Sequence, residues 1–258
     1  GSSVLATANV MMAACLAEGT TLIECAACEP EVVDLANYLN ACGAHITGHG
    51  TPRIMIDGVR ELHGCEHNVI PDRIEAGTFM IAAAITNGDI KLSNCRLDHL
   101  MALVDSLRSI GVNIERLPDG AQVSSSRRLE PVMITTQPYP GFPTDLQAQV
   151  MALLCLADGN SIITEKIFPD RFVHVAELSR MGAKLRKEGP TVIIEGVKNL
   201  VGAPVMASDL RASAALVVAG LVAKGKTKIS RVYHIDRGYE HIEQRLVALG
   251  ADIQRVAE

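Results

Sequence analysis

Long runs of small apolar side chains recur along the chain, and each run is predicted to form a helix. These runs are rich in Ala, Val, Ile, Leu and Met, and a glycine lies within two residues of the end of each. Glycine adopts the left-handed turn that ends many helices at little cost. The predicted helices of this first kind, called apolar helices below, span residues 9–18, 74–86, 146–157 and 210–223.

A short strand and then an amphipathic helix are predicted after each apolar helix. The strands span residues 20–24, 89–92, 160–164 and 226–230. The amphipathic helix shows apolar residues three and four positions apart, as in Val32, Ala36 and Leu39 of the first copy and Ile242, Leu246 and Leu249 of the fourth. Further strands are predicted at residues 44–47, 53–57, 191–195 and 251–256.

Two series of glycines repeat with nearly the same period. Gly19, Gly88, Gly159 and Gly225 are separated by 69, 71 and 66 residues, and Gly43, Gly111, Gly182 and Gly250 by 68, 71 and 68 residues. The sequence therefore predicts four copies of an α-β-α-β-β unit of about 70 residues. Because the strands after the second helix pair as hairpins, the fold class is α/β with mixed sheets.

The third apolar helix is preceded by Pro143, Thr144 and Asp145. Thr144 is predicted to be the N-cap, with Gln147 three residues later closing a capping box. Asp145 then has no capping role, and its carboxylate at a helix start could serve as a general base or orient a substrate. The alternative is that Asp145 is only a favourable acidic residue of the first turn.

Arginine stands in the first turn of two predicted helices, as Arg73 and Arg211. A positive charge there opposes the helix dipole, so these residues invite a functional explanation. Helix starts that faced the same way would together form a surface for binding anions. The alternative is that the polar clusters at these helix starts are ordinary N-caps.

Composition narrows the classes of partner. The 258 residues are 48% hydrophobic and 21% charged, with a net charge of −5 and a pI near 5.9. This acidic balance, with 3% aromatic residues, gives no support for nucleic-acid binding. The longest apolar run, residues 212–223, is too short to span a membrane, and no stretch is typical of a signal peptide.

The seven cysteines are scattered through apolar segments, as expected for reduced thiols in the cytoplasm. Cys25 and Cys28 form the single C-x-x-C pair, and a zinc site would need two further ligands. Cys42, His45 and His49 are the nearest candidates, but their spacing matches no common zinc pattern. We therefore expect no metal site.

Seven ordered strings of residues resemble the enolpyruvyl transferases, in the branch that acts on UDP-N-acetylglucosamine. They are MMAACLAEGTT at 11–21, EPEVVD at 29–34, PDRIEAGTF at 71–79, FPTDLQAQ at 142–149, RFVHV at 171–175, DLRAS at 209–213 and HIDRGYE at 234–240. The resemblance covers essentially the whole chain. The shikimate-pathway branch of the family shares the fold but not these strings.

The resemblance implies an inside-out α/β barrel type of fold, with two domains that each contain three copies of the repeated unit. Six copies are expected, and four are present here. The chain begins with Gly1 instead of Met and is expected to be the C-terminal part of such a protein. Residues 1–66 would then be one unit of a truncated first domain, and residues 67–258 would form the second domain.

The resemblance also implies an addition–elimination reaction. The 3′-hydroxyl of UDP-N-acetylglucosamine attacks C2 of phosphoenolpyruvate, and phosphate then leaves. Asp145 would take the hydroxyl proton, Arg237 would be catalytic, and no cofactor is implied. The step is the first committed one of peptidoglycan synthesis, which implies a cytoplasmic enzyme of cell-wall biogenesis, linked to cell shape and to division in the cell cycle, with neither nucleic-acid nor membrane partners.

Arg171, Arg211 and Arg237 match cleft positions of the family, where guanidinium groups would hold carboxylate and phosphate groups. Asp72, Arg73 and Asp209 match positions whose residues serve either the site or the local helix start. The substrate-binding residues carried over from the family are Ser2, Ser3 and Val4 along the uridine nucleotide, Ile167 as an apolar contact to it, and Asp72, Arg73, Asp145, Arg171, Asp209, Arg211 and Arg237.

Some family features find no match among these residues. The lysine that binds phosphoenolpyruvate and the cysteine of the mobile loop have no counterpart here, and Leu5 and Cys28 replace the usual Gly and Arg. We therefore expect the 258 residues alone to be inactive and their first copy to expose apolar surface. The alternative function is a noncatalytic sugar-nucleotide-binding or scaffold protein, while an RNA 3′-phosphate cyclase is disfavoured by the acidic balance.

Overall fold

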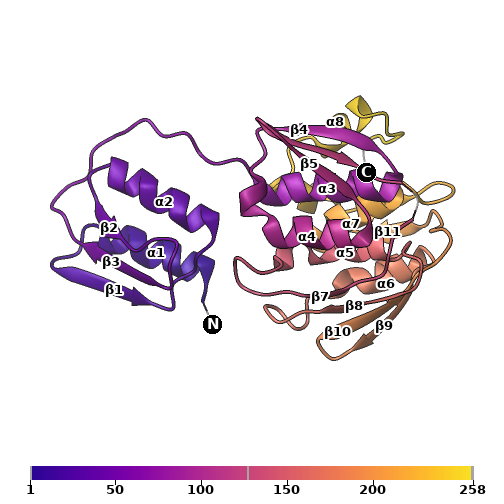
Figure 1. Ribbon diagram of the computed structural model, residues 1–258, viewed down its shortest axis with the longest axis horizontal. Coiled ribbons are helices and arrows are strands. Elements are labelled where there is room, and N and C mark those ends of the chain that lie inside the picture. The colour runs from indigo at the N-terminus through magenta and orange to yellow at the C-terminus, as the bar shows by residue number, and fades with distance from the viewer. Residues whose placement is uncertain (1, 127, 257–258) are drawn as a thin grey trace. The chain divides into compact units, whose positions relative to one another are not determined.

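The computed structural model describes residues 2–126 and 128–256 (Figure 1). The chain divides into two compact units, each considered by itself. The smaller comprises Gly1–Pro71 together with Pro138–Gly141, and the larger comprises Asp72–Gln137 together with Phe142–Glu258. The domain boundary predicted after residue 66 lies within Gly1–Pro71, which is the first part of the smaller unit.

The smaller unit packs two helices against a three-stranded antiparallel sheet of order β1-β3-β2. Its elements are α1 (Val4–Ala14), β1 (Thr20–Glu24), α2 (Pro30–Ala41), β2 (His45–Thr47) and β3 (Arg53–Asp57). Alternate residues of β3 face the core, where Ile54 and Ile56 are fully buried. Met11 of α1 and Ala36 of α2 pack in the same cluster.

Helix α1 begins five residues before the predicted start at residue 9. Ser3 is its N-cap, and the Ser3 hydroxyl accepts a hydrogen bond from the Ala6 N–H at 3.3 Å. The added turn places Leu5 on the helix surface with 75% exposure, and Met12 is also exposed. This copy of the unit therefore does expose apolar surface.

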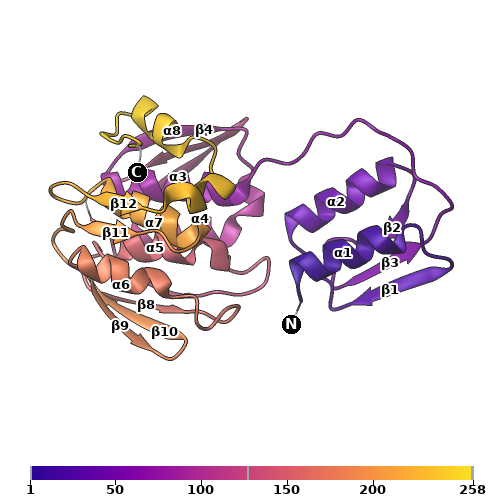
Figure 2. The ribbon, with the colours of Figure 1, turned by 180° about the vertical axis from the view of Figure 1, so that it is seen from behind.

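The larger unit has three mutually packed helices at its centre, with the sheets outside them (Figures 1 and 2). The central helices are α3 (Arg73–Thr86), α5 (Gln147–Leu154) and α7 (Leu210–Gly220). Every residue of α5 is buried, as are most residues of α3 and α7, which explains why these three runs are mostly apolar. Small side chains such as Ala82, Ala152 and Ala215 let the helices approach one another.

The sheets of the larger unit include both parallel and antiparallel pairs, and one sheet, β7-β8-β10-β9, is itself mixed as predicted. One has the order β4-β6-β5, a second β7-β8-β10-β9 with β7 parallel to β8, and a third pairs β11 with β12 in parallel. Their strands are β4 (Asp89–Ser93), β5 (Asn113–Leu117), β6 (Gly120–Ser124), β7 (Met133–Thr135), β8 (Asn160–Thr164), β9 (Lys184–Glu188), β10 (Thr191–Glu195), β11 (Pro204–Met206) and β12 (Lys228–Ser230).

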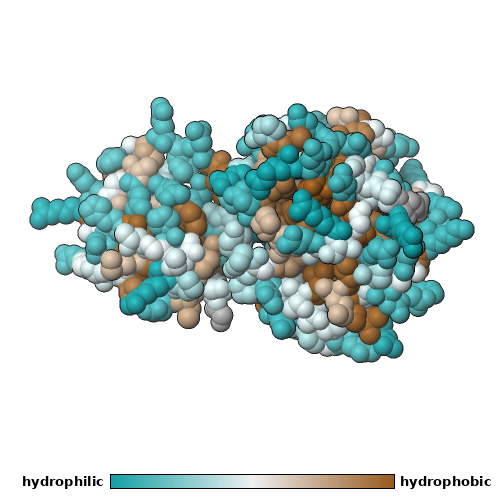
Figure 3. All heavy atoms as spheres, viewed as in Figure 1, coloured by the Kyte–Doolittle hydropathy of each residue, from teal (hydrophilic) through white to brown (hydrophobic). Residues whose placement is uncertain are grey.

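Outer helices and short turns complete the larger unit. They are α4 (Met101–Ile110), α6 (Val173–Arg180), α8 (Ile242–Ala248), and the 3₁₀ turns η1 (Leu97–His99), η2 (Thr144–Leu146) and η3 (Val232–Arg237). Drawn as spheres, the larger unit shows apolar atoms between polar ones over the region where α3 and α4 are seen in Figure 1 (Figure 3).

Three of the four predicted copies show the expected order of elements, and the fourth departs from it. The series α1-β1-α2-β2-β3, α3-β4-α4-β5-β6 and α5-β8-α6-β9-β10 each read α-β-α-β-β. Residues 251–256, predicted as a strand, have no regular structure, because no described strand pairs with them and Arg255 is held by Asp236 and Glu243 instead. The count of four copies stays a prediction.

Candidate functional site

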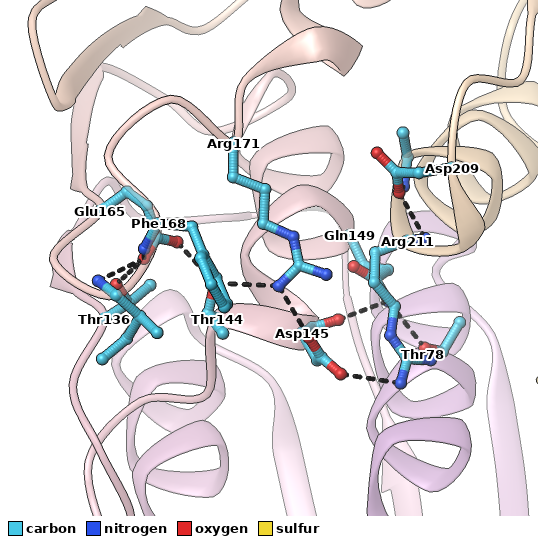
Figure 4. A network of polar contacts seen from close by, with 12 residues as sticks. Thr78, Thr136, Thr144, Asp145, Gln149, Glu165, Phe168, Arg171, Asp209 and Arg211 are labelled. Carbon is cyan, nitrogen blue, oxygen red and sulfur yellow. Dashed lines mark hydrogen bonds and ion pairs between the residues drawn. The ribbon is translucent and has the colours of Figure 1, made fainter. Parts of the chain in front are cut away.

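The carboxylate of Asp145 lies between two guanidinium groups of the larger unit (Figure 4). Its Oδ1 accepts from Nη1 of Arg171 at 2.7 Å, and its Oδ2 accepts from Nη2 of Arg211 at 2.8 Å. The three side chains come from η2, from the segment before α6, and from the first turn of α7. The Asp145 side chain is 34% exposed, so it remains partly accessible to solvent.

The two arginines determine the charge state of this carboxylate. Burial raises the pKa of Asp145, but the positive charges and hydrogen bonds of Arg211 and Arg171 outweigh burial and hold that pKa below its usual value of 3.8. Asp145 is therefore ionised near neutral pH. While both ion pairs persist, it is a weak base, and any anion that drew away a guanidinium would increase its basicity.

The predicted capping box at this helix start is wrong. Thr144 belongs to the 3₁₀ turn η2, and its hydroxyl donates to Oε2 of Glu165 at 2.8 Å while accepting from Nη1 of Arg171 at 3.1 Å. The hydroxyl thus has tertiary partners in place of the helix N–H groups. Helix α5 begins at Gln147 without a side-chain cap, and the buried Gln147 amide finds no partner in the described chain.

Glu165 follows β8 and is fully buried. Its Oε1 accepts from the Thr136 hydroxyl at 2.5 Å and from the N–H groups of Ile167 at 2.8 Å and Phe168 at 3.0 Å. With Thr144 on Oε2, the carboxylate has four donors (Figure 4). The sequence analysis did not find Glu165. The available signal was one acidic residue directly after the apolar strand 160–164.

Asp209 and Asp72 are both N-caps, and their roles toward a substrate stay predictions. Asp209 Oδ1 accepts from the N–H groups of Arg211 at 2.8 Å and Ala212 at 2.9 Å, at the start of α7. Asp72 Oδ1 accepts from the N–H groups of Ile74 at 2.7 Å and Glu75 at 3.0 Å. The cap at Asp209 fixes the backbone from which the Arg211 side chain reaches Asp145.

Tyr239 is a buried centre of hydrogen bonding that the sequence analysis also missed. Its hydroxyl contacts the Thr78 hydroxyl at 2.8 Å, Nε2 of Gln149 at 3.3 Å and Nη1 of Arg211 at 3.5 Å. Gln149 also donates to the backbone oxygen of Asp145 at 3.0 Å. One hydroxyl therefore links α3, α5 and α7 behind the ion pairs, and burial raises the pKa of Tyr239.

Comparison with known proteins places this geometry in a family. A sequence profile described as EPSP synthase (3-phosphoshikimate 1-carboxyvinyltransferase) matches residues 1–246. The chain belongs to the EPSP synthase family of enolpyruvyl transferases. This result confirms the predicted resemblance and assigns the chain to a family of enzymes.

Curated relatives in this family carry the name UDP-N-acetylglucosamine 1-carboxyvinyltransferase. The protein of that name from Nitratidesulfovibrio vulgaris (strain DP4) is 57% identical over 255 residues, which cover 98% of this chain and 61% of the relative. The one from Geotalea uraniireducens (strain Rf4) is 58% identical over 257 residues, covering 100% and 62%. The chain thus spans about three fifths of the length of these relatives.

Solved structures confirm the enolpyruvyl transferase fold. The enolpyruvyl transferase NikO from Streptomyces tendae superposes with a TM-score of 0.88 at 27% identity, covering 96% of this chain and 60% of that one. EPSP synthase from Acinetobacter baumannii gives a TM-score of 0.73 at 21% identity, with coverage of 96% and 60%, and is similar in fold alone. The mixed α/β class is therefore established.

Of the residues carried over from the enolpyruvyl transferases, Asp145, Arg171 and Arg211 are in direct contact. Arg237, at the end of η3, is exposed and forms no hydrogen bond or ion pair with any described residue. It borders a surface hollow of about 710 Å³. The structure therefore does not bring Arg237 into contact with Asp145.

For the other residues carried over from the family, the structure shows no hydrogen bond or ion pair with Asp145 among the described residues. Arg73 opens α3 and is half-buried, and Ile167 is half-buried in the turn after β8, with its N–H on Glu165. Ser2, Ser3 and Val4 belong to the smaller unit, where Ser3 caps α1. Their roles toward a substrate stay predictions.

Within residues 2–126 and 128–256, no group of three His, Cys, Asp or Glu side chains is placed to hold a metal ion. Cys25 and Cys28 are free thiols, as are the other cysteines. No described helix combines the length and apolarity required to cross a membrane.

Acid sensitivity is expected from His174 of α6, which is 2% exposed and whose Nε2 lacks a partner within the described residues. Burial lowers the pKa of His174 to about 4 from 6.5, and Asp209 only partly opposes this. Between these pH values the unfolded chain binds a proton that the folded protein does not. The free energy of unfolding should therefore fall as pH drops from 6.5 to 4, by on the order of 3 kcal/mol.

Denaturant unfolding at several pH values would measure this loss. The His174→Gln variant cannot titrate, so its stability should change less than that of the wild type over this interval. The effect is separable from that of Asp145, because the lowered pKa of Asp145 places most of its own loss of stability below its usual value of 3.8. Parallel curves for the two proteins between pH 4 and 6.5 would contradict the prediction.

Proposed function

We propose that the protein carrying this chain transfers the enolpyruvyl group of phosphoenolpyruvate to the 3′-hydroxyl of UDP-N-acetylglucosamine. The observation that supports this most is the Asp145 carboxylate held between Arg171 and Arg211, in a chain 57% and 58% identical to two relatives named for that activity. The reaction would be the first committed step of peptidoglycan synthesis. It would place the protein in the cytoplasm and in cell-wall growth, and so connect it with cell shape and division.

The chemistry requires a base and a set of cations. As the sugar hydroxyl adds to C2 of phosphoenolpyruvate, its proton passes to a base, and a tetrahedral adduct forms before phosphate leaves. Asp145 would be that base, because its partly exposed carboxylate lies in the 3₁₀ turn η2, where two guanidinium groups hold it. Arg171 and Arg211 would stabilise the carboxylate or phosphate charge of the substrate.

The pKa of Asp145 fits this role only if the substrate changes the ion pairs. An anionic substrate that binds Arg171 or Arg211 would compete with Asp145 for the guanidinium. The pKa of Asp145 would then rise, and one carboxylate oxygen would become free to accept the hydroxyl proton. Substrate binding would thus produce the base that the reaction needs.

The remaining carried-over residues would contribute to binding. Arg237 is exposed and without a partner among the described residues, so its guanidinium is available to a substrate anion. Ile167 would contact the uridine nucleotide, as would residues 2–4 of the smaller unit. Asp72, Arg73 and Asp209 would set the helix starts that face the substrate.

The test is phosphate release from phosphoenolpyruvate by the protein that carries this chain, expressed from its complete reading frame. Release should require UDP-N-acetylglucosamine and should not occur with shikimate 3-phosphate. Release with shikimate 3-phosphate instead would overturn the proposed acceptor. Nucleotide binding without any release would favour the noncatalytic alternative. The 258 residues alone are expected to bind the nucleotide weakly without sustained turnover, since neither the family's lysine nor its loop cysteine is matched in them.

A further inference from the structure

The buried carboxylate of Glu165 lies next to the proposed site without touching Asp145. It is 0% exposed and forms no ion pair with any residue that the structure describes. A buried carboxylate is costly unless hydrogen bonds compensate it, and here four donors do so. A neutral glutamine would occupy the same volume at lower cost. The acidic group therefore requires an explanation beyond packing.

Glu165 determines the direction of the Thr144 hydroxyl. Three donors occupy Oε1, and Oε2 faces only the Thr144 hydroxyl, so that hydroxyl must donate. Once its hydrogen is directed to Glu165, the Thr144 oxygen offers its lone pairs to Arg171 Nη1, which contacts it at 3.1 Å. The same Nη1 donates its second hydrogen to Asp145 at 2.7 Å.

A glutamine at position 165 would reverse this direction. Its carbonyl would be retained by the donors on Oε1, so its NH₂ group would face Thr144 as a donor. The Thr144 hydroxyl hydrogen would then have to turn elsewhere, toward the space that the Arg171 guanidinium occupies. Only a carboxylate accepts on both sides, which links the charge of Glu165 to the orientation of Arg171.

Glu165 also shapes the surroundings of Arg171 from the other side. Its bonds to the Ile167 and Phe168 N–H groups close the turn that precedes Arg171. The Phe168 ring lies 5.4 Å from Cζ of Arg171, within the range of a cation–π contact. One carboxylate thus holds both the hydroxyl and the ring that confine the guanidinium (Figure 4).

We propose that Glu165 is a positioning residue, which orients Arg171 through the Thr144 hydroxyl and thereby sets the geometry of the Arg171–Asp145 pair. The expected effect of Glu165 on kcat rests on the proposed function of Asp145. The expected effect of Glu165 on the pKa of Asp145 does not, since that pKa depends only on the folded protein.

The experiment compares Glu165→Gln, Thr144→Val and the double variant in the protein that carries this chain. Carboxyl ¹³C NMR would follow the titration of Asp145, and steady-state kinetics would follow kcat and KM across pH. Each single variant should raise the pKa of Asp145, because a displaced Arg171 stabilises the carboxylate less. Each should also lower kcat about tenfold, as expected when a reacting group is misplaced by a fraction of an ångström.

The double variant distinguishes positioning from a merely structural role. If Glu165 acts through Thr144, the double variant should be no more affected than either single variant in titration and kcat. Thr136→Val is the matched control, because it removes another hydrogen bond to Glu165, and with it the Lys166 N–H bond to the Thr136 hydroxyl at 2.9 Å. It leaves the Thr144 hydroxyl between Glu165 and Arg171. It should reduce stability without moving the Asp145 titration.

Three results would overturn the proposal. They are an unchanged Asp145 titration in Glu165→Gln, effects of the two single variants that simply add, and a shift in Thr136→Val as large as in Thr144→Val. If Glu165→Gln fails to fold, the comparison of Thr144→Val with Thr136→Val decides, since of these two only Thr144→Val should shift the titration. A wild type that binds substrates without turnover would disprove the proposed function, while the NMR titration would still test Glu165.

Discussion

Replacing Asp145 by asparagine in the protein that carries this chain is expected to lower kcat by about 10²–10⁴, the usual cost of losing a positioned base. The amide keeps the shape of the side chain but cannot take a proton from a hydroxyl. It also leaves Arg171 and Arg211 without their shared counter-charge, although both are partly solvated. We therefore expect the fold to be retained.

The measurement is the rate of phosphate release at saturating substrates, together with a denaturant unfolding curve. Asp98→Asn is a matched control, because Asp98 also pairs with an arginine, Arg96 at 2.6 Å, and its pKa is likewise lowered, chiefly by that hydrogen bond. The control should turn over at the wild-type rate. If Asp145→Asn also did so with unchanged stability, Asp145 could not be the base.

The second large effect is expected from Gly196→Ala, with a loss of about 3–5 kcal/mol in the free energy of unfolding of the larger unit. A Cβ atom at Gly196 would lie 1.8 Å from the backbone oxygen of Ala157 and 3.1 Å from that of Gly159. Both neighbours are backbone atoms, so rotation of a side chain cannot relieve the overlap. The Gly196 N–H also donates to the Gly159 oxygen at 3.0 Å, which holds the two segments together.

Gly220→Ala is the control for this prediction. Gly220 ends α7, and an added Cβ would meet only Thr227 atoms at 3.7 Å and beyond. Alanine is favoured over glycine in a helix, so this variant should be neutral or more stable. Denaturant curves followed by circular dichroism would compare the two. Equal midpoints for Gly196→Ala and the wild type would show that the close approach does not constrain the fold.

The turns that depend on local backbone chemistry could be predicted from the sequence. All four glycines of the second series have a positive φ, namely Gly43 at +99°, Gly111 at +103°, Gly182 at +88° and Gly250 at +96°. The left-handed conformation is required where the amphipathic helix ends, and glycine adopts it without strain. Such a helix end depends only on one glycine and its immediate neighbours, so it can be predicted from the sequence.

The ends of the apolar helices were predicted less well. Helix α5 ends at Leu154 instead of residue 157, and an irregular turn carries the chain to Gly159. At the end of α3, Asn87 takes the left-handed conformation in place of the predicted Gly88. Apolar composition continues through these turns because tertiary packing buries them, so hydrophobicity alone does not mark where the helix stops.

The candidate site could be predicted only through family resemblance. Asp145, Arg171 and Arg211 come together from positions 26 and 66 residues apart from Asp145, which local pattern cannot show. The capping rule failed at Thr144 because a distant carboxylate, Glu165, competes for its hydroxyl. Tyr239 was missed because its partner Thr78 is 161 residues away.

The mutual packing of α3, α5 and α7 has a consequence for how the chain acquires its structure. These helices are separated by more than fifty residues in sequence, so the centre of the larger unit depends on non-local contacts. Non-local contacts form only when long loops close, and the entropy lost in closing them makes folding slow. During synthesis α3 and α5 emerge before their partner α7. The apolar surfaces that pack against α7 therefore stay uncovered until α7 has been made. The larger unit is therefore expected to fold late, when residues up to about 220 have left the ribosome.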